Sequence, residues 1–140
     1  MFLFAMAHGQ QKGDNTIIVK GTPFEQIVGI LLADKYLIDH ENDSEIVTKP
    51  IEFVEQKNQS TKKYSIIMDI KFKESSKVAL ITGKYNYNIL MNNILGPTVN
   101  GADFKPVANI ESKSSYIRKS FILMDNFAKS LNGQITYAKL

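Results

Sequence analysis

The stretch Tyr64-Ser65-Ile66-Ile67-Met68-Asp69-Ile70-Lys71-Phe72-Lys73 decides the fold. Apolar residues alternate with polar ones along it, and only Ile67 departs from the pattern. A period of two is typical of a strand with one buried face and one mostly wet face. Glu74-Ser75-Ser76-Lys77 supplies turn residues, and Val78 through Tyr87 returns as a partner strand. The pattern therefore predicts a long antiparallel hairpin.

A strand and a helix are predicted upstream of this hairpin. Thr16-Ile17-Ile18-Val19-Lys20 is rich in β-branched residues, and Gly21 ends it. Thr22-Pro23-Phe24-Glu25 then favours a helix start, with Thr22 as the cap, Pro23 in the first position and Glu25 completing a capping box. The helix should end near Asp34 or Lys35. Its expected buried stripe consists of Phe24, Ile27, Val28, Leu31 and Leu32.

Further elements follow on both sides of the hairpin. Tyr36-Leu37-Ile38 and Glu45-Ile46-Val47-Thr48 are expected to be short strands, whereas Pro50 limits a strand around residues 51–54. A second helix should begin after Ser112 or Ser114 and end at Asn132-Gly133. Ile135 and Tyr137 suit a last short strand. The expected apolar stripe of the second helix consists of Ile117, Phe121, Met124, Phe127, Ala128 and Leu131.

These elements predict an α+β fold of two layers. The order is β-α-β-β-β-β-α, with an antiparallel sheet of about five strands and two helices on one face. In strand 16–20, the helix entry 21–25 and the lysine-rich hairpin, residues 16–82 resemble uncharacterised exported bacterial domains with a TATA-binding-protein-like fold. The resemblance implies the topology and export but no activity. Likeness of fold does not transfer DNA binding.

Composition restricts the possible functions. The 140 residues suit a single domain, predicted at 12–140, that needs no metal or disulfide for stability. Because the chain has no cysteine, thiol catalysis, cysteine zinc sites and iron–sulfur clusters are excluded. No cofactor is predicted. No segment approaches the ~20 apolar residues of a membrane helix.

The first residues, Met1-Phe2-Leu3-Phe4-Ala5-Met6-Ala7, are apolar or small. They favour the end of a secretory signal within residues 1–11, with the mature chain beginning near Gln10 or Gln11. A buried or frayed first strand is the alternative. The signal predicts a periplasmic or secreted protein, and the second interpretation a cytoplasmic one.

The charge pattern argues against nucleic-acid binding. Sixteen of the seventeen basic residues are lysines, and Arg118 is the single arginine, although arginine is the usual residue for gripping phosphates. Residues 34–56 carry a net charge of −5 and residues 57–86 a net charge of +5. The favoured interpretation is that acidic and basic strands are neighbours whose charges pair. The alternative is a lysine face that binds an anionic polymer.

Residues 85–104 form the most prominent candidate surface. From residue 88 onward no clear periodicity appears, yet the apolar content is high for a connection of this length. Residues 88–96 are expected to form a short helix that closes the core; a lid or a contact surface is the alternative. The residues proposed to contact a protein partner or a small apolar ligand are Tyr85, Tyr87, Leu90, Met91, Ile94, Leu95 and Phe104.

A weaker candidate is the acidic cluster around His40. Asp39, His40, Glu41 and Asp43 offer oxygen ligands and one imidazole, but they do not follow a calcium-loop pattern, because Ser44 stands where glycine is needed. A solvated acidic hairpin is the favoured interpretation. Asp69 is expected on a wet strand face and Asp125 on an exposed helix position, so neither marks a catalytic centre.

Three functions follow from these features. The first is a non-enzymatic, exported binding module that uses residues 85–104. The second is a small carboxylate-based enzyme around Asp39–Glu45. It requires His40 to converge in one cleft with at least two of Asp39, Glu41, Asp43 and Asp69. The third is a lysine-face binder of an anionic polymer. Catalysis is disfavoured because no known catalytic motif occurs in the sequence.

Overall fold

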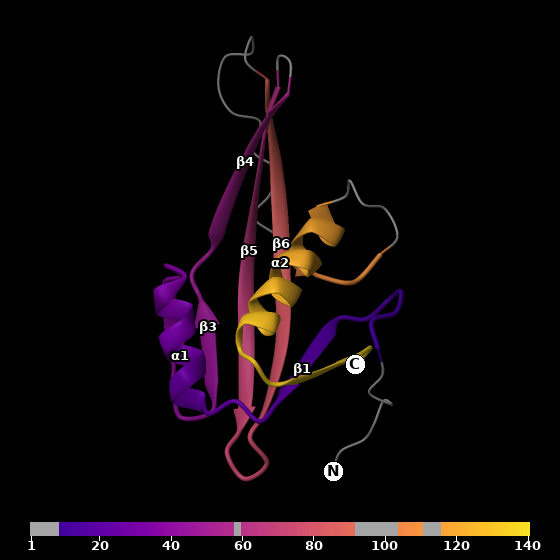
Figure 1. Ribbon diagram of the computed structural model, residues 1–140. Coiled ribbons are helices and arrows are strands. Elements are labelled where there is room, and N and C mark those ends of the chain that lie inside the picture. Colours follow the sequence, from indigo (N-terminus) through magenta and orange to yellow (C-terminus); the bar gives the residue numbers. More distant parts are fainter. Residues whose placement is uncertain (1–8, 58–59, 92–103, 111–115) are drawn as a thin grey trace.

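The computed structural model describes residues 9–57, 60–91, 104–110 and 116–140 (Figure 1). Within these ranges the protein is an α+β domain with two helices and an open antiparallel sheet of eight strands. The predicted class is confirmed, although the sheet has more strands than the five expected. In chain order the elements are β1 (Thr16–Lys20), α1 (Phe24–Ala33), β2 (Ile38–Glu41), β3 (Glu45–Thr48), β4 (Ile51–Lys57), β5 (Ser60–Lys73), β6 (Val78–Met91), β7 (Lys105–Pro106), α2 (Tyr116–Ser130) and β8 (Gln134–Ala138).

The predicted hairpin is the centre of the sheet. β5 and β6 pair along their whole length, and the strand order is β2-β3-β5-β6-β1-β8. The outer edge of β5 pairs with β3 over one part of its length and with β4 over another. In the same way, the outer edge of β6 pairs with β1 and, further along, with β7. Figure 1 shows β4, β5 and β6 running upward past the helices as a narrow ribbon.

The break between β3 and β4 is satisfied by a side chain. β3 pairs with residues 69–71 of β5, whereas β4 begins opposite Ile66. Between them, Pro50 has no N–H to donate, so the ladder cannot continue. The Met68 N–H instead donates to Thr48 Oγ1 over 3.0 Å, and both residues are buried. The edge therefore changes strands without leaving this buried donor unpaired.

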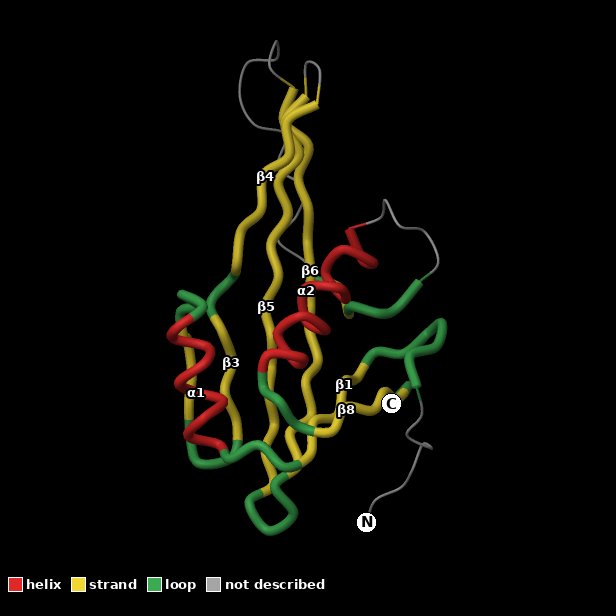
Figure 2. Tube along the Cα trace, viewed as in Figure 1, coloured by secondary structure: helices red, strands yellow, loops and turns green. Residues whose placement is uncertain are grey.

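Both helices lie on the same side of the sheet (Figure 2). Ile27 and Leu31 of α1 and Phe121 and Met124 of α2 are fully buried against it. The expected stripe of α2 is confirmed, but that of α1 is wrong at Leu32, which is 57% exposed. Because α1 lies beside β3 at one margin of the sheet, the sheet covers only a narrow stripe of this helix.

The predicted capping box of α1 is wrong. Pro23 is the N-cap residue and no side chain caps the helix. The hydroxyl of Thr22 donates instead to the carbonyl oxygen of Leu131 over 2.9 Å, which joins the start of α1 to the end of α2. Past α2, Asn132 takes the left-handed conformation, with φ 59°. Gly133 must be glycine, because a Cβ there would lie 2.7 Å from the carbonyl oxygen of Lys20.

Two other expectations about local structure fail. Residues 36–37 leave α1 rather than open a strand, because the Tyr36 N–H donates to the Leu31 carbonyl oxygen over 3.0 Å. The helix expected over 88–96 is wrong for 88–91, since β6 continues to Met91 by pairing with β5. Residues 92–96 lie outside the described residues, as do residues 1–8 of the stretch 1–11 that the sequence predicts to be the end of a secretory signal.

Candidate binding site on the uncovered face of the sheet

The two faces of β5 differ in how they are covered. Ile66, Met68 and Ile70 are fully buried and belong to the core beneath the helices. Ile67 and Asp69 alternate with them, so they point to the opposite face, and both are half-buried. No helix of the described ranges covers that second face, which is called the open face below.

A hollow of about 540 Å³ lies on the open face. Its floor is formed by β3, β5 and β6. Its sides are formed by residues 106–107, by Asn15 and Thr16, and by Leu140. We call it the open-face hollow. Its apolar lining consists of Val47, Ile67, Leu80, Pro106, Val107 and Leu140.

One side of the hollow is held by hydrogen bonds between segments that are distant in sequence. The side-chain amide of Asn15 donates to the Leu140 carbonyl oxygen and accepts from its N–H, both over 2.9 Å. The N–H of Asn109 donates to the Asp14 carbonyl oxygen over 2.7 Å. The Gly13 N–H donates in turn to the Asn109 carbonyl oxygen over 2.6 Å. This side of the hollow is therefore formed by three chain segments that are distant in sequence, and not by a single loop.

One carboxyl group on the floor of the hollow, that of Asp69, has a second carboxyl group beside it. The register places Asp69 between Val47 of β3 and Thr82 of β6. Glu45 stands opposite Lys71, one diagonal step from Asp69, so the two carboxyl groups are neighbours. The negative charge of Glu45 disfavours ionisation of Asp69.

The surroundings of Asp69 change its acidity. Burial, and after it the neighbouring Glu45, raises its pKa from 3.8 to about 6. The positive charges of Lys71 and Lys84 oppose this effect without cancelling it. Asp69 therefore titrates close to neutral pH, which is common for carboxyl groups at binding and catalytic sites.

Asp69 also has an unused hydrogen-bond acceptor. Its Oδ1 atom is buried and accepts no hydrogen bond from any described residue. A buried polar atom without a partner is unfavourable, and such atoms in native proteins usually meet a water molecule or a ligand. The floor of the hollow thus presents an acceptor that the described protein groups leave unsatisfied.

Two lysines stand beside the carboxyl pair. Lys71 and Lys84 both line the hollow and are exposed. Neither ammonium group forms an ion pair with another of the described residues. The open-face hollow therefore combines apolar walls with the carboxyl group of Asp69 and two ammonium groups.

The surface predicted at residues 85–104 is only partly visible. Tyr85 is 7% exposed and belongs to the core, so it cannot contact a partner, and Phe104 is half-buried. Pro106 and Val107, which directly follow this region, line the open-face hollow. The side chains of three predicted positions and the whole of two others lie outside the described part of the structure: Tyr87, Leu90 and Met91, and Ile94 and Leu95.

The acidic cluster around His40 does not converge. Asp39, His40, Glu41 and Asp43 are all exposed. Where the structure describes the chain, no three His, Asp or Glu side chains gather closely enough to hold a metal ion. The register puts His40 opposite Val47 on the open face, two strands from Asp69 and so roughly 10 Å away.

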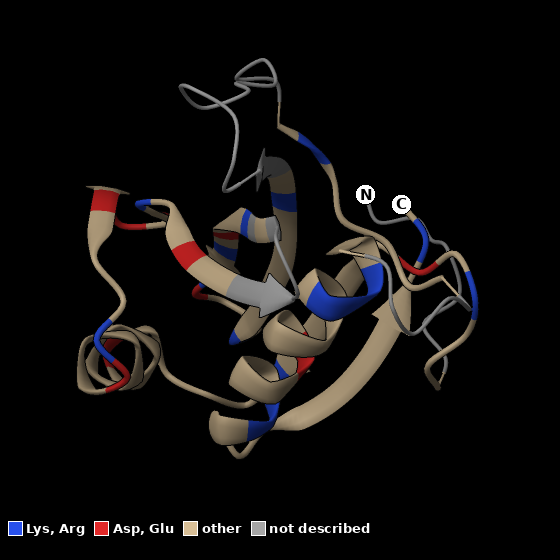
Figure 3. Cartoon of the chain, turned by 90° about the horizontal axis from the view of Figure 1, so that it is seen from above, with Lys and Arg blue, Asp and Glu red and all other residues tan. Residues whose placement is uncertain are grey.

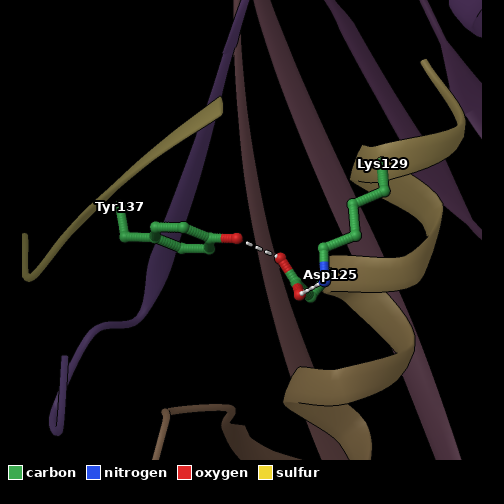
Figure 4. A network of polar contacts seen from close by, with 3 residues as sticks. All are labelled: Asp125, Lys129 and Tyr137. Atoms are coloured by element: carbon green, nitrogen blue, oxygen red, sulfur yellow. Dashed lines mark hydrogen bonds and ion pairs between the residues drawn. The ribbon is translucent and has the colours of Figure 1, made fainter. Parts of the chain in front are cut away.

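A second buried aspartate serves the fold. Asp125, expected to be exposed, is 6% exposed, because α2 turns this position towards β8. Figure 4 shows its two contacts: the Tyr137 hydroxyl donates over 2.5 Å and the Lys129 ammonium lies at 2.9 Å. Burial, followed by the hydrogen bond and charge of Asp125, raises the pKa of Tyr137 above its ordinary value. Both carboxylate oxygens have partners, so this network is complete.

Acidic and basic strands are neighbours in the sheet, and their charges pair. Acidic β4 pairs with the lysine-rich half of β5, and Glu52 forms an ion pair with Lys63 over 3.3 Å. Figure 3 shows basic residues on α2, on strands and near the C-terminal end. These contacts agree with the interpretation that acidic and basic strands pair.

Sequence reasoning missed the open-face hollow and placed Asp69 on a wet surface. One signal was present: Ile67 breaks the alternation of β5 by putting an apolar residue on the outward face. Val47 and Leu80 add apolar residues at outward positions of the neighbouring strands. An apolar patch on a nominally solvated face indicates a contact surface.

Comparison with known proteins assigns no family. No family model matches this chain, and no curated protein matches it in sequence. In the described part of the chain, no helix combines the length and apolar character needed to cross a membrane.

Proposed function

We propose that this protein is a non-enzymatic binding module that holds a small, mainly apolar ligand in the open-face hollow. The observation that carries the proposal is a buried, unpartnered acceptor, Asp69 Oδ1, at the floor of an apolar depression. The class of function is the one expected from the sequence. The site lies on the open face, next to residues 85–104 and not within them.

The size and chemistry of the hollow support a small-molecule ligand. About 540 Å³ falls within the range of roughly 300–1,000 Å³ that is common for ligand pockets. Such pockets are mostly apolar, with a few polar groups that fix orientation. Here Val47, Ile67 and Leu80 form part of the apolar surface, and Asp69 provides the fixed polar group.

A methyl NMR titration tests the proposal without knowledge of the natural ligand. Protein labelled at Ile, Leu and Val methyl groups is titrated with indole, an apolar probe with one N–H donor. The proposal predicts that methyl resonances of Val47, Ile67 and Leu80 shift in a saturable manner.

Exposed apolar residues on the helix side of the molecule provide the internal control. Leu32 and Ile122 are 57% and 40% exposed and lie outside the hollow. Their methyl resonances should shift little. Equal shifts at both sets, or shifts confined to the control set, would contradict a binding site on the open face.

A carboxylate-based enzyme is the second candidate, and the carboxyl pair favours it. A carboxyl group with a pKa of about 6 next to another carboxyl group suits general acid–base chemistry. The candidate pair is Asp69 with Glu45, and His40 does not join it. This alternative predicts that compounds bound in the hollow are converted, which NMR spectra of the probes after prolonged incubation would reveal as new ligand signals.

The lysine-face alternative has less support on the open face. Lys71 and Lys84 share that face with Glu45 and Asp69, so its charge is mixed. An anionic polymer needs a surface of predominantly positive potential and binds in a salt-dependent manner. A polymer such as heparin should therefore shift the hollow methyl resonances less than indole does.

A further inference from the structure

The unpartnered acceptor restricts the chemistry of the ligand. Asp69 Oδ1 is already buried without a hydrogen-bond donor among the described residues, and a ligand without a donor group would leave it unsatisfied. The ligand must therefore carry an N–H or O–H group that reaches the floor of the hollow. Its remaining body must be apolar to match Leu80, Val107 and Leu140.

The carboxyl pair favours a positively charged donor. Glu45 lies beside Asp69, and the two groups repel each other when both are ionised. An ammonium group has several N–H donors and a positive charge, so it satisfies Oδ1 and relieves this repulsion together. Hydrogen bonds between charged partners are also stronger than those between neutral ones.

The two lysines disfavour a ligand that is only a cation. Lys71 lies two residues from Asp69 on the same face of β5, and Lys84 stands opposite Ile67, diagonal to Asp69. Both ammonium groups are exposed and make no ion pair within the described residues. A cationic ligand would be repelled by them, whereas a carboxylate on the same ligand would attract them.

We propose that the open-face hollow binds a small zwitterion with an apolar body, of the class of apolar α-amino acids. The ammonium group binds Asp69, which has Glu45 beside it, the carboxylate faces Lys71 and Lys84, and the side chain lies on the apolar wall. This inference rests on the proposed function, because it requires the hollow to be a ligand site. It adds the charges that the ligand must carry.

Isothermal titration calorimetry at neutral pH with three matched probes tests the inference. L-phenylalanine carries both charged groups, phenethylamine only the ammonium group, and 3-phenylpropionate only the carboxylate. We expect L-phenylalanine to bind about tenfold more tightly than either single-charge analogue, because a charged hydrogen bond changes the affinity by at least about tenfold. Equal binding of all three probes would overturn the inference.

Variants then locate each charged contact. Asp69→Asn should weaken L-phenylalanine and phenethylamine about tenfold and leave 3-phenylpropionate unchanged. The double variant Lys71→Gln/Lys84→Gln should weaken L-phenylalanine and 3-phenylpropionate and spare phenethylamine. Lys73→Gln is the matched control, since Lys73 is on the same strand and face but outside the hollow. An equal loss for Lys73→Gln would contradict the assignment.

The outcomes separate this inference from the proposed function. If indole shifts the hollow methyl resonances but the charged probes bind equally well, the site stands and the zwitterion inference falls. If indole and all three probes leave those resonances unchanged, both fall. Glu45→Gln gives a second measurement of the ammonium contact should Asp69→Asn fail to fold, and it must weaken phenethylamine more than 3-phenylpropionate.

Discussion

The half-buried Asp69 and the buried Asp125 show how the same residue type serves different purposes. Asp125 has a partner for each carboxylate oxygen, Tyr137 on β8 and Lys129 one turn along α2. Asp69 has only another carboxyl group, Glu45, and one oxygen without a partner. The first arrangement stabilises the packing of helix against strand. The second is unfavourable for the isolated fold, which suggests that it is kept for a ligand.

Asp69→Asn should stabilise the protein at neutral pH by about 1 kcal/mol, a value reduced because water still reaches this half-buried site. The pKa of Asp69 is about 6 in the folded protein, above its ordinary value of 3.8. In the parent protein, Asp69 therefore makes its full stabilising contribution below pH 3.8, and this contribution is lost as the pH rises through 6. Chemical unfolding of both proteins across this range should show the advantage of the variant shrinking towards low pH.

The groups that face Asp69 define the controls for this pH dependence. They are Glu45 from β3, Lys71 on its own strand and Lys84 from β6, with His40 further away on the same face. Asp43→Asn, at an exposed turn, should leave the pH dependence of the unfolding free energy unchanged. A constant difference between Asp69→Asn and the parent at every pH would contradict the raised pKa.

Tyr137→Phe should destabilise the protein by about 1–3 kcal/mol, because it leaves a buried oxygen of Asp125 without its donor. Lys129→Ala should cost only about 0.5 kcal/mol, since the lysine is 62% exposed and its ion pair is a surface one at spacing i,i+4. Urea unfolding of the two variants measures both effects. The reverse order would show that the ion pair, and not the hydroxyl, holds Asp125.

At the scale of elements, two glycines show where α2 meets the sheet. A Cβ at Gly83 of β6 would overlap the sulfur of Met124 in α2, whereas a Cβ at Gly29 of α1 meets nothing within 4 Å. Gly83→Ala should therefore cost about 1–3 kcal/mol through overpacking. Gly29→Ala should stabilise by up to about 1 kcal/mol through helix propensity. Thermal unfolding that showed the same sign for both would contradict this contact.

The junction of β3 and β4 depends on one hydroxyl. Thr48→Val keeps the shape of the side chain but removes the acceptor for the buried Met68 N–H. We expect a loss of about 1–3 kcal/mol in unfolding free energy. Hydrogen exchange should also quicken at Met68, while the amide of Ile81 in the β6 ladder remains protected. Unchanged exchange at Met68 would show that the donor has another partner.

The elements that the sequence predicts well are those with regular periods. Alternation over residues 64–73 and the apolar stripe of α2 report burial directly, because one face of each element is covered. Thr22 was misjudged because its hydroxyl bonds Leu131, a partner far away in sequence. β4 and β7 each form only beside a longer strand, so pairing and not local preference places them.

At the scale of the whole molecule, the two faces of the sheet differ. The helices cover one face, while the described residues on the other face include Pro106, Val107 and the chain segments near Asn15 and Leu140. The open-face hollow was not predictable from spacing, because the register brings Val47, Asp69 and Thr82 into one row from three separate strands. Only the tertiary fold shows that these residues line one depression.

Filling the hollow should abolish binding without unfolding the protein. Thr82→Trp places a large side chain beside Asp69, whereas Ser65→Trp adds the same side chain on the same face of β5 but outside the hollow. We expect L-phenylalanine binding to disappear in the first variant and to persist in the second, as measured by calorimetry. Both should keep the circular dichroism spectrum of the parent. Binding that survived Thr82→Trp would place the ligand elsewhere.

The central claim is that a small ligand occupies the open-face hollow above Asp69. The most direct test is an intermolecular nuclear Overhauser measurement between the ring protons of bound L-phenylalanine and the labelled methyl groups of the protein. The predicted result is contacts to Leu80, Val107 and Leu140, which line the hollow. Contacts to Leu32 or Ile122 on the helix side instead, or no contacts at any methyl group, would contradict the claim.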